Sequence, residues 1–403
     1  MAAVRPFTAL RPAPDAAARV ASVPYDVVST DEARELTAGN PLSFLRVTRS
    51  EVDFPPDADP YADAVYAKAK ANLEEIRAAA PLERESEPSV YFYRLRMGEH
   101  EQTGVAACFS VDEYDRDLIK KHEKTRRDKE DDRTRHIVET RAQTGVVFLT
   151  YRASKQIDRL EAAAGAGAPL SDLPAPGGVH HQIWGPGGAG AQAVVDAFAK
   201  VPALYIADGH HRAASAARAR TAIAGKSPEG DWFIAVAFPD NQMQILSYNR
   251  MVKDLAGQSP ETFLAALSSR AAVTPGSATP AGRGRVSMYL AGAWYEIDLR
   301  GLAPATAVPA DALDVALLGT HVLRALLGIE DVRTDKRIDF VGGIRGTGEL
   351  ETRVDSGKAA VAFSMHPVTI RDLMAVSDTR GIMPPKSTWF EPKLRDGLLV
   401  HEI

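Results

Sequence analysis

Strand-like and helix-like hydrophobic patterns alternate along this chain. Apolar runs of strand length, each interrupted by a polar or glycine turn, predict β-hairpins at 90–111, 231–247 and 286–297. Between them, alanine, leucine and isoleucine recur at helical spacing, most clearly over 61–80. No unit is repeated. This mixture of strands and helices predicts the α+β (mixed α/β) class.

The most informative polar segment is Asp208-Gly209-His210-His211-Arg212, which separates the apolar run 203–207 from an alanine-rich run. This order predicts a strand, a tight turn and the start of a helix. A helix start leaves backbone N–H groups unpaired, and two histidines and an arginine would add cationic donors beside them. The segment therefore predicts a phosphate-binding site. Asp208 could hold a magnesium ion there, or it could only cap the helix by accepting its backbone N–H groups.

Composition limits the partners of such a site. The 403 residues include 48 basic and 53 acidic side chains, giving a formal charge of −5, which disfavours DNA and anionic membranes as partners. The apolar runs are shorter than the roughly 20 residues that cross a bilayer. One cysteine and an N-terminus without an export-signal pattern predict a cytoplasmic protein. We therefore expect a small-molecule substrate and a nucleotide as partners; the oligomeric state is left open.

A densely charged segment at 113–141 contains a second group of candidate residues. Its balanced charges, several at i, i+4 spacing, are typical of a solvated helix surface. His122 and Glu123 nevertheless lie among several lysines and arginines, a combination that could bind phosphate and move a proton. Glu123 is a candidate proton acceptor and His122 a candidate acid or donor to phosphate. Asp26 is a second candidate base, and the sequence does not choose between the two carboxylates.

Two later segments add candidate phosphate ligands. Asn249 and Arg250 follow a predicted strand and could face a ligand. Near the C-terminus, prolines stiffen a loop at 383–394, and a preorganised loop with cations, hydroxyls and aromatic rings suits an anionic ligand with a flat ring. Packing of its aromatic side chains on the protein body is an equally good interpretation. The candidate ligands of this loop are Lys386, Ser387, Thr388 and Lys393.

Breaks in the pattern predict the domain organisation. The segment 162–192 is rich in glycine, alanine and proline, which predicts a loop or hinge. We expect a nucleotide-binding domain over 1–250 that contains this hinge and the charged helical segment 113–141. A C-terminal α/β lobe is expected over 251–403, with 383–394 as its closing loop.

Taken together, these segments resemble a large prokaryotic family of unknown function over nearly the whole chain. Its Asp-Gly-His-His-Arg element is also similar to that of the ADP-dependent free-serine kinases, within the ParB and sulfiredoxin superfamily. The segments that carry the resemblance are Val23-Pro24-Tyr25-Asp26-Val27, Asn40-Pro41-x-Ser43-Phe44-Leu45-Arg46-Val47, His122-Glu123-x-Thr125, Asp208-Gly209-His210-His211-Arg212, Tyr248-Asn249-Arg250 and Pro384-Pro385-Lys386-Ser387-Thr388-Trp389-Phe390-x-Pro392-Lys393-Leu394.

The resemblance implies a ParB/sulfiredoxin-like nucleotide-binding core with a second α/β lobe. Its kinase branch implies phosphoryl transfer from ADP or ATP, with magnesium, to a small hydroxyl metabolite such as a serine-type amino acid. The histidines and Arg212 would then surround the phosphates. A non-catalytic nucleotide sensor is the alternative. Sulfiredoxin chemistry needs a cysteine in this turn, where the chain has histidines, and ParB-type DNA binding does not fit the acidic charge.

Overall fold

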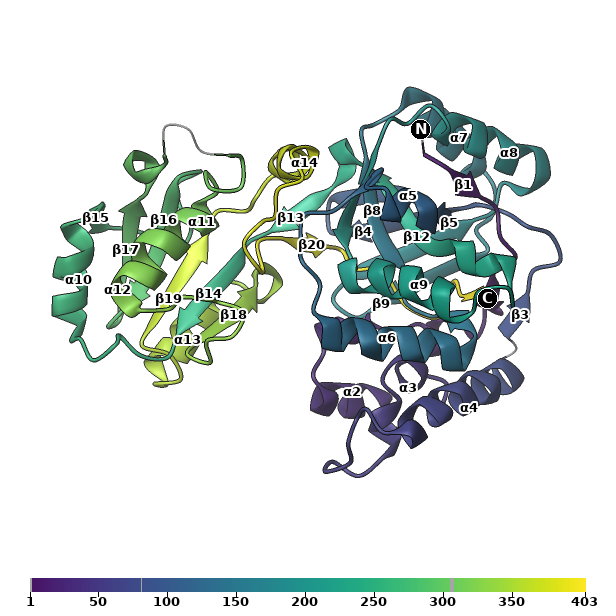
Figure 1. Ribbon diagram of the computed structural model, residues 1–403, viewed down its shortest axis with the longest axis horizontal. Coiled ribbons are helices and arrows are strands. Elements are labelled where there is room, and N and C mark those ends of the chain that lie inside the picture. The colour runs from purple at the N-terminus through teal and green to yellow at the C-terminus, as the bar shows by residue number, and fades with distance from the viewer. Residues whose placement is uncertain (1, 81, 305–307) are drawn as a thin grey trace. The chain divides into compact units, whose positions relative to one another are not determined.

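The computed structural model describes residues 2–80, 82–304 and 308–403, which form two compact units (Figure 1). Unit 1 comprises Met1–Met243 and Pro392–Ile403, and unit 2 comprises Gln244–Glu391. The first unit therefore ends slightly before the expected boundary at 250, and the end of the chain returns to it. The predicted mixed α/β class is confirmed. Within the described ranges, no helix is both long enough and apolar enough to cross a membrane.

Unit 1 is built on a nine-stranded mixed sheet, in the order β6-β11-β8-β12-β5-β4-β10-β9, with β1 paired to β5. The predicted hairpin at 90–111 is confirmed as β4 and β5, whose residues pair from Met97 with His100 outward. The strands are β1 (Val4–Arg5), β4 (Tyr91–Met97), β5 (His100–Ser110), β6 (Ile119–Lys120), β8 (Val147–Tyr151), β9 (Ser171–Ala175), β10 (Val179–Trp184), β11 (Leu204–Asp208) and β12 (Trp232–Pro239).

The predicted hairpin at 231–247 is wrong. Strand β12 is buried over 233–239, so it needs neighbours along both edges, and these are β5 and β8 rather than the next strand in the chain. Strand β13 (Gln244–Leu246) belongs to unit 2 and pairs with β20 (Trp389–Glu391). The apolar run thus predicted strand β12 correctly, but the expected pairing with the next strand in the chain was wrong.

The predicted hinge at 162–192 is also wrong. Most of this segment is ordered structure, because β9 and β10 form an antiparallel pair and β10 continues the sheet beside β4. Gly177 and Gly178 have φ angles of 83° and 73°, so these two glycines make the turn between the strands. Alternate residues of β10 are buried, which fixes the strand against the core.

Helices cover the sheet, and α6 and α9 lie side by side, joined by a hydrogen bond from Ser215 to the Glu130 carbonyl (Figure 1). The predicted helix over 61–80 is confirmed as α4. The charged segment is not one helix, because β6 interrupts it between α5 and α6. The helices of unit 1 are α1 (Ala17–Val20), α2 (Thr30–Thr37), α3 (Leu45–Thr48), α4 (Asp63–Ala79), α5 (Val111–Asp115), α6 (Arg127–Thr140), α7 (Lys155–Ala164), α8 (Gly187–Phe198) and α9 (His210–Ala222).

Two short strand pairs complete unit 1. Strand β2 (Leu10–Pro12) pairs with β3 (Leu82–Arg84), and β21 (His401–Glu402) pairs with β7 (Ala142–Gln143). The second pair attaches the last residues of the chain to the segment that leads into β8.

Unit 2 is a six-stranded antiparallel sheet in the order β15-β17-β16-β19-β14-β18. The predicted hairpin at 286–297 is confirmed as β16 and β17, in which Leu290 pairs with Ala293. The other elements are β14 (Tyr248–Val252), β15 (Ala272–Pro275), β16 (Arg285–Leu290), β17 (Ala293–Asp298), β18 (Ile338–Gly342), β19 (Val361–Met365), α10 (Pro260–Ser268), α11 (Asp314–Leu318), α12 (Ala325–Leu327), α13 (Gly348–Asp355) and α14 (Ile370–Asp378).

Candidate functional site

The predicted strand, turn and helix at the Asp-Gly-His-His-Arg segment are confirmed. Strand β11 ends at Asp208 and helix α9 begins at His210. Gly209 between them has a φ of 90°, a left-handed conformation that glycine adopts without steric cost. A Cβ atom at this position would lie 3.1 Å from both Cζ and Nε of Arg212. Glycine therefore permits both the turn and the close approach of Arg212 to the backbone.

Asp208 is held by two cations. Its Oδ2 accepts a hydrogen bond from Nζ of Lys393 at 2.9 Å, and its Oδ1 lies 3.6 Å from Nη2 of Arg212. Burial alone would raise the pKa of Asp208, but Lys393 and Arg212 reverse the effect and hold it well below its usual range. Lys386 and Lys393 are both candidate phosphate ligands. Lys393 contacts the Asp-Gly-His-His-Arg segment through this hydrogen bond.

The interpretation of Asp208 as the helix cap is wrong. Oδ1 accepts from the N–H of Gly209 at 2.8 Å, which precedes the helix, and no side chain caps the first turn of α9. The first backbone N–H groups of α9 therefore have no side-chain cap. The arrangement does not fit Asp208 as a magnesium ligand, since its carboxylate already contacts Lys393 and Arg212. Binding of magnesium together with a nucleotide stays a prediction.

Arg212 points into a network of internal contacts. Its side chain is 7% exposed, Nη1 donates to the carbonyl of Val146, and Nη2 donates to Oδ2 of Asp26 at 3.1 Å. Burial opposes the charge, yet Asp26 and Asp208 more than compensate and raise the pKa of Arg212 above its ordinary value. Arg212 is thus fully charged and joins Asp26, one of the two candidate bases, to the turn before α9.

The pairing of β6 with β11 brings the other candidate base to the same place. The two strands run parallel, with Tyr205 opposite Lys120, so their carboxyl ends reach the same edge of the sheet. The segment 121–126 that follows β6 lies against the first turn of α9. Glu123 Oε2 is 3.9 Å from Nδ1 of His210, and the backbone N–H of Arg126 donates to Nε2 of His211 at 3.0 Å.

His122 and His210 form a buried pair. Their rings are nearly perpendicular with centroids 4.4 Å apart, and both side chains are almost fully buried. Burial lowers the pKa of His122 to about 4, and burial together with the neighbouring His122 lowers the pKa of His210 well below its ordinary value. Both rings are therefore neutral at pH 7, so the buried positive charge here comes from Lys393 and Arg212 rather than from this pair.

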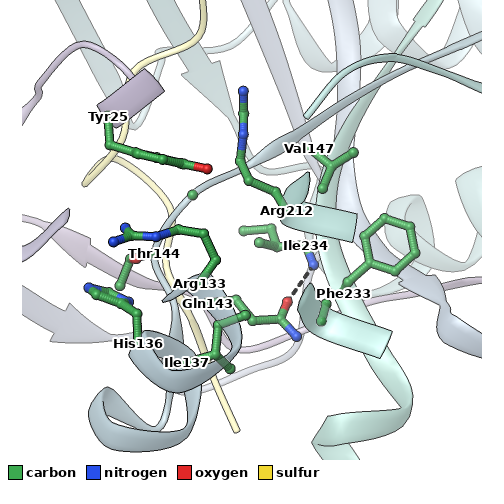
Figure 2. A pocket seen from close by; sticks show the side chains of 12 residues that line it. Tyr25, Arg133, His136, Ile137, Gln143, Thr144, Val147, Arg212, Phe233 and Ile234 are labelled. Atoms are coloured by element: carbon green, nitrogen blue, oxygen red, sulfur yellow. Dashed lines mark hydrogen bonds between the residues drawn. The ribbon is translucent and has the colours of Figure 1, made fainter. Parts of the chain in front are cut away.

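A small cavity lies behind Arg212 (Figure 2). It has a volume of about 30 Å³, which is room for a water molecule or two rather than for a nucleotide. The guanidinium of Arg133 lies over the ring of Tyr25 at 4.4 Å, and Gln143 accepts a hydrogen bond from the N–H of Ile234 at 2.8 Å. In Figure 2 the guanidinium of Arg212 points away from Gln143 and Ile137. The cavity is therefore a packing feature beneath the candidate site.

The remaining candidate ligands come together within unit 2. Oδ1 of Asn249 accepts from the N–H of Met365 at 3.0 Å, and Nη2 of Arg250 donates to the carbonyl of Lys386 at 3.0 Å. Ser387 donates to the carbonyl of Pro384 at 2.5 Å. The bond from Arg250 attaches the segment 384–388, which includes Thr388, to β14. A role of these residues in nucleotide binding stays a prediction.

Asp396 is a member of the charge network that the sequence did not indicate. Its side chain is 1% exposed. Burial raises the pKa of Asp396 to about 7, with the guanidinium of Arg212 opposing the increase and the carboxylate of Asp26 adding to it. It follows the predicted closing loop by two residues, and no motif in the sequence marks it. The network at the start of α9 thus contains Asp26, Asp208, Arg212, Lys393 and Asp396.

The fold and this strand–turn–helix site define a two-unit α/β protein with an uncapped helix start beside clustered charges. The chain belongs to a family described as a protein of unknown function, DUF1015, whose model matches residues 4–316. No curated protein matches the chain significantly in sequence.

Several solved structures are similar to this chain at low identity. SbnI with a C-terminal truncation, from Staphylococcus aureus, is 12% identical over 73% of this chain and 86% of its own, with a TM-score of 0.40. A free serine kinase in complex with AMP is 10% identical over 71% and 86%, with a TM-score of 0.37. A conserved hypothetical protein from Pyrococcus furiosus is 13% identical over 74% and 95%, with a TM-score of 0.35.

Proposed function

We propose that this protein is a nucleotide-dependent phosphotransferase that acts on a small hydroxyl metabolite, most simply a serine-type amino acid. One observation carries the proposal: Glu123 Oε2 lies 3.9 Å from Nδ1 of His210, in the first turn of α9. A half-exposed carboxylate and an uncapped helix start therefore share one location. The first can accept a proton and the second can bind phosphate oxygens. The similarity of the Asp-Gly-His-His-Arg element to that of the free-serine kinases supports the choice of phosphoryl transfer.

In this proposal each group has a distinct task. The hydroxyl oxygen of the acceptor attacks the terminal phosphorus of ADP or ATP, the bond to the bridging oxygen breaks, and AMP or ADP leaves. Glu123 takes the hydroxyl proton. The first N–H groups of α9 orient the transferred phosphoryl group, and Lys393 and Arg212 supply positive charge while they fix Asp208. Magnesium, when bound to the nucleotide, would neutralise phosphate charge; no residue is assigned to it.

A direct assay tests the proposal. Purified protein is incubated with magnesium, ADP or ATP labelled at the terminal phosphate, and a panel of hydroxy amino acids. We expect label on one acceptor, with formation of AMP or ADP in equal amount. Absence of both nucleotide binding and label transfer across the panel would overturn the proposal.

The alternative is a non-catalytic nucleotide sensor. One observation favours it: Asp26 and Asp208 are both occupied by Arg212, and Lys393 holds Asp208 as well. A site whose charges are largely paired internally can bind a ligand without supplying a free base. Tight binding of a nucleotide with no label transfer to any acceptor would select the sensor.

A further inference from the structure

Three side chains near the start of α9 form a cluster with the composition of a metal site. His122, Glu123 and His210 each offer a ligand atom, and these atoms lie within 4.8 Å of one another. The three residues come from the two segments that the parallel pairing of β6 and β11 brings together. Glu123 is half-exposed, so the cluster can be reached from solvent, whereas both imidazoles are buried.

One nitrogen of this cluster is a buried acceptor with nothing to accept from. His122 is 2% exposed, and its Nδ1 atom has no hydrogen-bond partner in the part of the chain that the structure describes. Leaving such a group unsatisfied in the interior costs on the order of 1–3 kcal/mol. A buried lone pair beside a second imidazole and a carboxylate is an unexplained feature that a bound cation would satisfy.

The other ring nitrogen of His122 explains why this lone pair is available. The imidazole hydrogen-bonds to the backbone carbonyl of Ile206, and because Nδ1 is the unpartnered atom, the donor is Nε2. A proton fixed on Nε2 leaves Nδ1 unprotonated. Histidines that bind metal ions are commonly held this way, with the distal N–H on a backbone carbonyl that sets the tautomer and orients the ring.

We propose that His122, Glu123 and His210 bind a divalent transition-metal ion of the zinc class. Two imidazole nitrogens and one carboxylate oxygen are a donor set that zinc and its neighbours prefer, whereas magnesium prefers oxygen ligands. The proposal is thus separate from the magnesium predicted at Asp208, and it does not depend on phosphoryl transfer. Three protein ligands leave a fourth position open to water or a ligand.

The distances indicate how the site would change on loading. Ligand atoms around a tetrahedral zinc ion lie about 3.3 Å apart, given bonds of about 2.0–2.1 Å, and His210 Nδ1 lies 3.9 Å from Glu123 Oε2. A modest inward movement of Glu123 would close this gap. The backbone N–H of His122 now donates to Nε2 of His210 at 3.4 Å. An ion on Nδ1 of His210 requires the proton on Nε2, so this long contact would break and the segment 121–126 would shift.

Metal titration without any nucleotide tests the proposal. Untagged protein is stripped with a chelator and titrated with Co²⁺ while visible absorption is recorded, and Zn²⁺ is then added. We expect one equivalent of Co²⁺ to produce the absorption bands of a four-coordinate site and one equivalent of Zn²⁺ to remove them. Glu123→Gln should weaken Co²⁺ binding by about tenfold or more, and His122→Gln should abolish the bands.

His180→Gln is the matched control, because His180 pairs with Asp172 at the surface and lies outside the cluster. It should bind Co²⁺ like the unaltered protein. Since His122 is buried and its variant could misfold, the half-exposed Glu123 gives the decisive variant, with far-UV circular dichroism as the check on folding. Failure of the stripped protein to take up one equivalent, or equal affinity in folded Glu123→Gln, would overturn the metal site. Phosphoryl transfer is assayed separately, so failure of the metal site is distinguishable from failure of the proposed function.

Discussion

Lys393 donates from Nζ to Oδ2 of Asp208 at 2.9 Å, joining the end of the chain to the turn that precedes α9. The two residues are 185 positions apart, and Lys393 follows directly on the segment that leaves unit 2. The contact ties the returning C-terminal segment to the candidate site. It also compensates a carboxylate that would otherwise depend on Arg212 alone.

We expect Lys393→Ala to destabilise the protein by about 1–2 kcal/mol, because Asp208 is then left with one cation in a largely buried position. Urea denaturation measures the change. Lys68→Ala is the control: its partner Glu75 is 66% exposed, and loss of such a surface pair should cost no more than about 0.5 kcal/mol. Equal losses in the two variants would show that the Lys393 contact is not stabilising.

Arg212→Ala should cost more, on the order of 3–5 kcal/mol, because it removes the buried cation that pairs with both Asp26 and Asp208. Chemical denaturation provides the measurement. Arg300→Ala, which breaks an exposed pair with Asp298, should change the free energy of unfolding by no more than about 0.5 kcal/mol. A loss below about 1 kcal/mol in Arg212→Ala would contradict the structural role.

Gly209→Ala and Gly98→Ala form a matched pair. Both glycines have a positive φ, at 90° and 58°, so alanine carries a backbone penalty of about 1–2 kcal/mol at either position. Only at Gly209 does the added Cβ approach another residue, 3.1 Å from the guanidinium of Arg212, whereas nothing lies within 4 Å at Gly98. We expect Gly209→Ala to lower the melting temperature further than Gly98→Ala. The same decrease in both variants would mean that Arg212 moves aside without cost.

Local patterns predicted local structure well. The strand, turn and helix around the Asp-Gly-His-His-Arg segment were predicted correctly. The apolar run before it, the glycine within it and the alanines after it determine the conformation of neighbouring residues, so a local pattern is sufficient. The hinge prediction at 162–192 failed because glycine content was counted over a whole segment. Two adjacent glycines were enough to make one turn, and the alternation of β10 fixed the rest.

The composition of the site depends on contacts that sequence patterns do not encode. Glu123 reaches His210 through the pairing of β6, a strand of two residues inside a charged segment, with a partner far along the chain. Such a strand is too short for a periodicity. The burial of Arg212 is likewise decided by Asp26 and Val146, both distant in sequence, so a residue expected to face phosphate faces the interior.

Asp396 should make stability depend on pH. Burial raises its pKa from 3.8 to about 7, so between these values the folded state binds more protons than the unfolded state, and stability falls as the pH rises. Asp396→Asn lacks this group. The free energy of unfolding of Asp396→Asn minus that of the unaltered protein should therefore increase by roughly 2–4 kcal/mol as the pH rises from 4.5 to 8.

Comparing the two proteins at each pH removes the effect of other groups. His136, whose pKa burial lowers to about 4, acts in the opposite direction, because stability from a buried neutral histidine is lost as the pH falls below about 6.5. That contribution is common to both proteins and cancels. A difference that stays constant from pH 4.5 to pH 8 would contradict the raised pKa of Asp396.

Glu123→Gln and Asp26→Asn distinguish the two candidate bases if the protein transfers phosphate. Glu123 is half-exposed and lies beside the first turn of α9, so Glu123→Gln should lower kcat by about 10²–10⁴ while nucleotide affinity and melting temperature stay near their original values. Asp26 holds Arg212, so Asp26→Asn should lower the melting temperature. Any loss of its activity should follow the loss of folded protein. Equal kcat in Glu123→Gln and the unaltered protein, with a collapse of kcat in folded Asp26→Asn, would assign the base to Asp26 instead.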